Sequence, residues 1–125
     1  MRSKILTNCF AVASFIIIAN SEGHASNCEM LDHAVDESRT QLKRASDEDN
    51  FNSAKDYMRR ARNALDDASM GAMDCRCITA QIEFDDSATY AKRARDASSP
   101  KEFNNLLNRS IGSFNSALHA LRTCR

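Results

Sequence analysis

The fold is decided near the middle of the chain, where residues 74–78 read Asp-Cys-Arg-Cys-Ile. Cys28 precedes Cys75 by 47 residues, and Cys124 follows Cys77 by the same 47 residues. Cys75 and Cys77 are too close along the chain to join each other without strain, because a disulfide needs a defined separation of its two Cα atoms. The stretch therefore separates two segments of equal length, each with a cysteine at either end.

The two segments resemble each other beyond their cysteines. A shift of 49 residues gives 11 identities in 48 positions without a gap, and nine of these are independent of the cysteines that set the shift. Residues 43–45 and 92–94, for example, share the run Lys-Arg-Ala. Because 49 residues are seven heptads, the shift also preserves the phase of a helix. We predict an internal duplication, with repeats over about 28–75 and 77–124.

Apolar residues recur at steps of three and four in four segments, which predicts helices over about 28–45, 51–75, 78–97 and 100–123. The third segment is the least regular, because Ile82 lies off its apolar stripe. The predicted inward residues, in chain order, are Cys28, Leu31, Val35, Ser38, Leu42, Ala45, Phe51, Ala54, Met58, Ala61, Leu65, Ala68, Ala72, Cys75, Ala80, Phe84, Ala88, Ala91, Ala94, Phe103, Leu107, Ser110, Phe114, Ala117, Leu121 and Cys124.

Polar residues mark the expected helix boundaries. The segment 46–50 offers N-cap side chains for the second helix. Ser99 can cap the fourth helix, Pro100 suits its first position, and Glu102 can reach back to complete a capping box. Asp74 is expected to cap the third helix across the short link. Because short connections make neighbouring helices antiparallel, the sequence predicts an all-α, up-down four-helix bundle of two similar hairpins.

In such a bundle the four cysteines lie at one end, which predicts two disulfides in an exported chain. The repeat favours the pairs Cys28–Cys75 and Cys77–Cys124. Each bridge would close a loop of 48 residues and stabilise the fold by about 4 kcal/mol in the chain-entropy model. Pairing across the hairpins, Cys28–Cys77 with Cys75–Cys124, is the alternative. Four reduced thiolates could instead hold zinc, but export favours disulfides.

Residues 1–25 are predicted to be a secretory signal peptide. Two basic residues precede an apolar run over 5–19, and the polar segment 20–25 ends in small residues. The run of about 15 residues is too short to span a membrane comfortably, although an uncleaved anchor is the alternative interpretation. Cleavage after Ala25 would leave 26–125 as a secreted or periplasmic domain without membrane contact.

The charge balance argues against two classes of partner. The chain has 17 basic and 17 acidic residues, and the predicted mature chain keeps 15 and 16 of them, a net charge of −1. Binding to nucleic acid or to anionic membranes requires a basic excess, so neither is expected. The chain also has no Trp, with only six Phe and two Tyr for stacking on bases or sugars.

Two histidines are candidate ligands, and each has a simpler structural interpretation. His33 with Asp36 and Glu37 could bind a metal, but the spacing of three and four also fits a solvated helix face. His119 could be a haem ligand, but it lies off the apolar stripe and no C-x-x-C-H motif accompanies it. We therefore expect no metal and no cofactor.

Two basic clusters could bind phosphate or an acidic partner. Nearby acids, such as Asp56 and Asp66, lie three or four residues from the arginines of the first cluster, which predicts a salt-bridged surface instead. The clusters are Arg59, Arg60 and Arg62, and Lys92, Arg93 and Arg95.

No arrangement of residues predicts catalysis. The pairs at 66–67 and 85–86 are adjacent aspartates, which point in different directions on a helix, whereas acid–base catalysis by two carboxylates needs convergence. An enzyme would need carboxylates or His to converge between the first and third helices. We expect a small exported, non-catalytic binding protein with an unknown protein or small-molecule partner. The alternative is a carrier of a metal or small ligand within the bundle.

Overall fold

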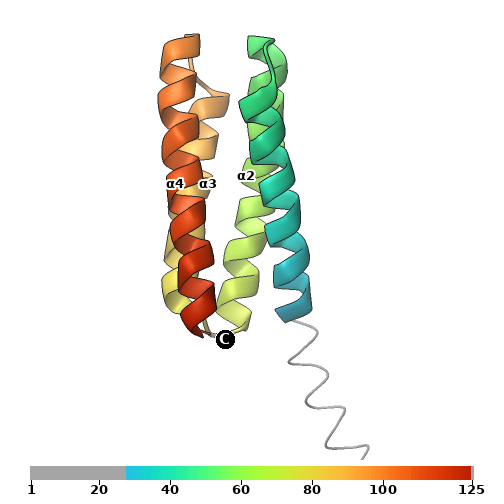
Figure 1. Ribbon diagram of the computed structural model, residues 1–125, viewed down its shortest axis with the longest axis vertical. Coiled ribbons are helices and arrows are strands. Elements are labelled where there is room, and N and C mark those ends of the chain that lie inside the picture. The colour runs from blue at the N-terminus through green and yellow to red at the C-terminus, as the bar shows by residue number, and fades with distance from the viewer. Residues whose placement is uncertain (1–27, 125) are drawn as a thin grey trace, which may run out of the picture.

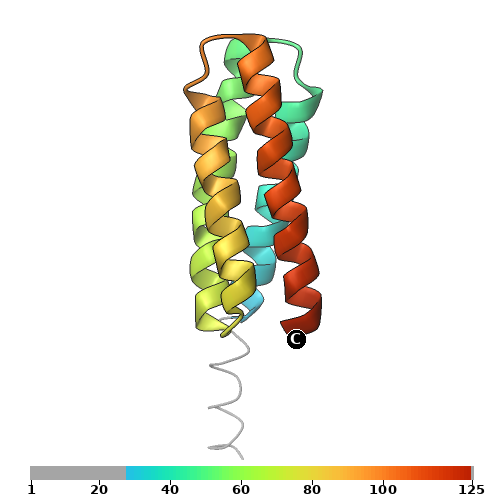
Figure 2. The ribbon, with the colours of Figure 1, turned by 90° about the vertical axis from the view of Figure 1, so that its left-hand side faces the viewer.

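The computed structural model describes residues 28–124, which form four helices. They are the first helix (residues 28–47), α2 (Phe51–Asp74), α3 (Ile78–Arg95) and α4 (Pro100–Cys124). Figures 1 and 2 show an antiparallel bundle in which α2 and α4 are the neighbours of both the first helix and α3. No strand occurs between residues 28 and 124. The predicted fold class, an up-down four-helix bundle, is confirmed.

The N-terminal caps of α2 and α4 follow the prediction. The Asn50 Oδ1 atom accepts a hydrogen bond from the Ser53 N–H at 2.9 Å, which satisfies one of the free amides in the first turn of α2. At the start of α4 the Glu102 N–H donates to Ser99 Oγ at 3.2 Å. The Glu102 carboxylate accepts in return from the Ser98 N–H at 2.9 Å, one residue before the amide of a standard capping box.

The link between α2 and α3 differs from the prediction. Cys77, not Asp74, is the N-cap of α3, and its side chain makes no capping hydrogen bond. The backbone closes α2 instead, because the Arg76 N–H donates to Met73 O at 3.0 Å and the Cys77 N–H donates to Ala72 O at 2.8 Å. These are the two bonds of a Schellman motif, which places Arg76 in the left-handed region with φ of 64°. Asp74 was therefore wrongly assigned, since it remains the last residue of α2.

The core runs along the whole bundle and contains most of the predicted inward residues. Cys28 and Phe51 are only partly buried, and Cys124 is exposed. Each helix contacts two neighbours, so its buried face is wider than one stripe, and the prediction missed residues on the flanks. These are, among others, Ala34, Gln41, Ala64, Ser69, Gly71 and Ser87.

Both disulfides lie at the end of the bundle where α2 ends and α3 begins. Cys28 is bonded to Cys75 and Cys77 to Cys124, with Cα atoms 5.6 Å and 5.7 Å apart. The pairing within each hairpin, which the repeat favours, is the one in the structure. Since all four sulfurs are used in disulfides, none is available as a zinc thiolate.

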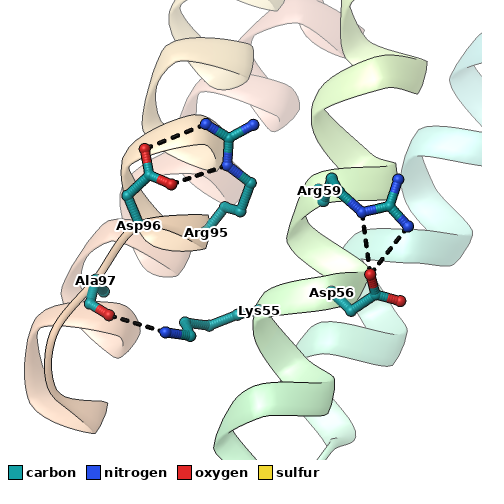
Figure 3. Close-up of polar contacts among 6 residues, drawn as sticks. All are labelled: Lys55, Asp56, Arg59, Arg95, Asp96 and Ala97. Carbon is teal, nitrogen blue, oxygen red and sulfur yellow. Dashed lines mark hydrogen bonds and ion pairs between the residues drawn. The ribbon is translucent and has the colours of Figure 1, made fainter.

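The opposite end of the bundle is closed by aromatic and cationic contacts. The rings of Phe51 and Phe103 meet edge to face, with centroids 5.9 Å apart. Lys55 lies over the Phe51 ring, 4.6 Å from its centroid. Figure 3 shows the Lys55 ammonium donating a hydrogen bond to Ala97 O, at a distance of 3.2 Å. This bond joins α2 to the loop that follows α3.

The predicted signal peptide lies outside the described residues. Between residues 28 and 124 no helix is both long and apolar enough to cross a bilayer. The paired cysteines are compatible with an extracellular protein, because disulfides persist in oxidising compartments.

Candidate binding groove

An open groove of about 860 Å³ lies between the first helix and α2, the two helices of the first hairpin. Its floor is formed by small buried residues, Ala34 on the first helix and Ala64 and Gly71 on α2. Exposed side chains of both helices form its walls. We call this hollow the acidic groove, because four carboxylates line it.

The groove exists because small side chains line the contact between the two helices. A Cβ atom added to Gly71 would lie 3.0 Å from both Cα and Cβ of Leu31. The first helix and α2 therefore approach each other more closely at this point than any larger residue would allow. Ala34 and Ala64 do not fill the space above this contact, so a hollow remains between the outer parts of the helices.

Negative charge in the groove is left without cationic partners. The carboxylates of Glu29, Asp67 and Asp74 line it and take part in none of the six ion pairs found within residues 28–124. Arg60 is the one Lys or Arg among the lining residues, and it is bonded to Asp56 at 3.0 Å. Elsewhere on the surface, Asp36, Asp47, Asp56, Asp66 and Asp96 each pair with a Lys or Arg.

A fourth carboxylate of the groove is held in place by a buried amide. The Gln41 Nε2 atom donates to Glu37 Oε2 at 2.7 Å, from a side chain that is almost fully buried. This hydrogen bond reduces the rotamers open to Glu37, so its charge has a defined position on the wall of the first helix.

Two methionines add apolar surface to the acidic groove. Met30 is 68% exposed and Met70 is 55% exposed, and one comes from each wall. The remaining large apolar side chains that are exposed between residues 28 and 124 are Met73, Ile78 and Ile82, all in the half of the bundle that contains the disulfides. Unbranched thioether chains adapt to differently shaped ligands, so the two methionines give the groove adaptable apolar surface.

The second hairpin has a smaller hollow in the equivalent place, which we call the polar groove. It has a volume of about 540 Å³ and lies between α3 and α4. The shift of 49 residues superposes six of its lining residues on residues of the acidic groove. These are Thr79 on Met30, Glu83 on Ala34, Ser116 on Asp67, His119 on Met70, Ala120 on Gly71, and Thr123 on Asp74.

The two grooves differ most in charge. At the positions of Glu29, Asp67 and Asp74 the second repeat has Ile78, a serine and a threonine, so three of the four groove carboxylates have no charged equivalent. The two hollows therefore lie at corresponding positions of the two hairpins, whereas these three carboxylates and the two methionines occur in the first one.

The candidate metal ligands do not share one site. His33 and Glu37 line the acidic groove, whereas Asp36 does not and bonds instead to Arg39 at 3.0 Å. Within the described part of the chain, no three His, Cys, Asp or Glu side chains converge as a metal site requires. His119 lies in the polar groove, on the exposed side of α4.

The first basic cluster is a salt-bridged surface, as predicted. Asp56 bonds to Arg59 at 2.9 Å and to Arg60 at 3.0 Å, and Arg62 bonds to Asp66 at 3.1 Å. The hydrogen bond from Arg59, shown in Figure 3, lowers the pKa of Asp56 below its ordinary value because it favours the ionised form.

The second basic cluster is held partly by an ion pair and partly by an aromatic ring. Arg95 bonds to Asp96 at 2.9 Å, which lowers the pKa of that carboxyl group (Figure 3). Arg93 and Arg109 lie 5.9 Å and 5.8 Å from the centroid of the Tyr90 ring. Of the two arginines in this cluster, Arg95 is therefore paired with an acid and Arg93 contacts an aromatic ring.

The interior contains no acid–base pair. The buried polar residues between 28 and 124 are four serines and a glutamine, with no buried carboxylate or His among them. The first helix and α3 lie diagonally across the bundle (Figures 1 and 2), so only core residues separate them.

The fold and the groove define a class of protein, a disulfide-bonded four-helix bundle of two hairpins with an acidic groove on the surface of the first hairpin. Comparison with known protein families, characterised proteins and solved structures finds no significant match.

Proposed function

We propose that this chain is a small exported, non-catalytic binding protein that recognises its partner through the acidic groove. One observation carries the proposal: unpaired carboxylates and exposed methionines line the same hollow in the first hairpin. Exposed methionines and carboxylates without Lys or Arg partners offer a ligand of matching chemistry both apolar surface and charge.

The covalent frame of the bundle supports recognition by the same groove. The Cys28–Cys75 disulfide joins the start of the first helix to the end of α2. Glu29 and Asp74, which line the groove, directly adjoin these two cysteines in the sequence. The bridge therefore keeps the two walls in register, and a pre-organised site loses less entropy on binding. The signal-like N-terminus and the paired cysteines support the proposal that the protein is exported.

A carrier that holds its ligand inside the bundle is the weaker candidate. Met58, Leu65 and Phe84 have no exposed surface at the centre of the core. Both grooves described above open at the surface, where each hairpin meets solvent. Binding between the helices would require the core to separate, which close packing opposes.

A photo-crosslinking amino acid placed at Met70 tests the proposal in the protein's own secretory compartment. The matched control carries the same probe at His119, the equivalent position of the second repeat. We expect a discrete crosslinked adduct from position 70 and none from position 119. Equal crosslinking from both positions, or none from position 70, would contradict a role for the acidic groove.

A further inference from the structure

We infer that the partner of the acidic groove is a basic amphipathic helix, with Lys or Arg along its flanks and an apolar face toward the groove. This inference rests on the proposed function and adds the chemical class of the ligand. It is carried by the placement of the groove's charges, by its apolar surface and by its length.

The charges form two rows, one on each wall. Asp67 and Asp74 are seven residues apart on α2, a rise of about 10.5 Å, and Glu29 and Glu37 are eight residues apart on the first helix, a rise of about 12 Å. Basic residues at i and i+7 of an α-helix have nearly the same separation. A helix with basic residues on both flanks can therefore place cations beside both rows.

Apolar surface lines the same groove as these carboxylates. Met30 on the first helix and Met70 on α2 contribute to it, one from each wall. An amphipathic helix binds such a groove by burying its apolar face, as in other helix-in-groove complexes. A simple polyamine would satisfy the carboxylates but would leave both methionines in water, so the observations favour the helix.

The length of the groove sets the length of the ligand. Its wall on α2 extends from Arg60 to Asp74, which is about 21 Å of helix and corresponds to a ligand of about 14 residues. Such a helix is marginal in isolation, so its folding is expected to accompany binding.

The test is a titration of the protein, with both disulfides intact, by a synthetic peptide of about 14 residues. The peptide contains Leu on one helical face and Lys on the other. Calorimetry measures its affinity, and NMR follows the methyl groups of Met30 and Met70. We expect binding with shifts of both methyl signals. Three control ligands are a scrambled peptide of the same composition, a peptide with Glu in place of Lys, and spermidine. Equal affinity for any of them, or absence of binding by the basic peptide, would overturn the inference.

Variants of the protein identify the surface. We expect the double substitution Asp67→Asn and Asp74→Asn to weaken peptide binding by about tenfold and to reduce its dependence on salt. The matched control, Glu83→Gln with Asp86→Asn on α3, should leave the affinity unchanged. If both pairs weaken binding equally, attraction is unspecific and the groove is not the site. Circular dichroism confirms that each variant is folded.

The two proposals can fail separately. If the probe at Met70 captures a partner but the basic peptide does not bind, the ligand class is wrong and the binding function stands. If the peptide does not bind and position 70 captures nothing, both proposals are wrong.

Discussion

Ser87 of α3 and Ser110 of α4 exchange hydrogen bonds across the second hairpin. The Ser87 Oγ donates to Ser110 O at 2.7 Å, and the Ser110 Oγ donates to Ser87 O at 2.9 Å. The equivalent residues of the first hairpin are Ser38 and Ala61, and there the Ser38 Oγ donates to Ala34 O of its own helix at 2.8 Å. The two hairpins thus differ in the hydrogen bonds that these equivalent serines make.

Removal of one hydroxyl should weaken the second hairpin. Ser110→Ala deletes one of the two cross-helix bonds at a fully buried position, and we expect a loss of about 1 kcal/mol in the free energy of unfolding. Urea denaturation measures the loss. The control is Ser116→Ala on the exposed side of the same helix, where a change within about 0.5 kcal/mol is expected. Similar effects of both variants would mean that the buried pair contributes nothing specific.

The two helical glycines should respond in opposite directions to alanine. Gly71→Ala places a methyl group 3.0 Å from the backbone of Leu31, and we expect it to lower stability by about 1–3 kcal/mol. Gly112→Ala meets nothing within 4 Å on an exposed face of α4, and we expect it to raise stability by about 0.5–1 kcal/mol. Thermal unfolding compares them, and an increase in stability for Gly71→Ala would contradict the close approach that forms the groove floor.

Replacement of Arg76 by glycine is expected to stabilise the protein. Its φ of 64° costs a side-chain-bearing residue roughly 1–2 kcal/mol, which glycine avoids at a somewhat smaller cost in unfolded-state entropy. Arg76→Gly should therefore raise the free energy of unfolding by up to about 1 kcal/mol. Arg76→Val, which disfavours this conformation further, should lower it. Equal stability of the two variants in urea would show that the link is not constrained.

The ion pairs of Asp56 should make stability depend on pH on the acid side. Because Arg59 lowers the pKa of Asp56 in the folded state, the ionised carboxylate stabilises the fold at pH values above the ordinary Asp pKa of about 3.9. This contribution is lost as the pH falls through the folded-state pKa. Asp56→Asn should thus be less stable than the native chain at pH 7, and the difference should disappear at strongly acidic pH. A difference that stays constant with pH would exclude the carboxylate as its cause.

Export and oxidation can be checked together by mass. The protein isolated from a secretory compartment without reducing agent should have the mass of residues 26–125 less four hydrogens, for two disulfides. The mass of the 125-residue chain would show that the predicted signal peptide is retained. A mass that retains those four hydrogens would show four free thiols and would contradict the two disulfides.

The sequence alone determined the helices and their boundaries within about two residues, and it favoured the pairing of cysteines within each hairpin that the structure contains. Caps and apolar periodicity act within a few residues of the chain, as at Asn50 and Ser99, so they can be read without the fold. The repeat supplied the one long-range constraint, because equivalent cysteines occupy equivalent places in the bundle.

Only the tertiary structure decided which surface residues act together. Asp67 and Glu37 come from different helices, and the sequence does not show that they line the same groove. The rotation of each helix about its axis is set by the packing of the whole core, including the contact of Gly71 with Leu31. Local pattern predicts which face of a helix is buried, whereas the pairing of exposed flanks depends on side chains that are distant in the sequence.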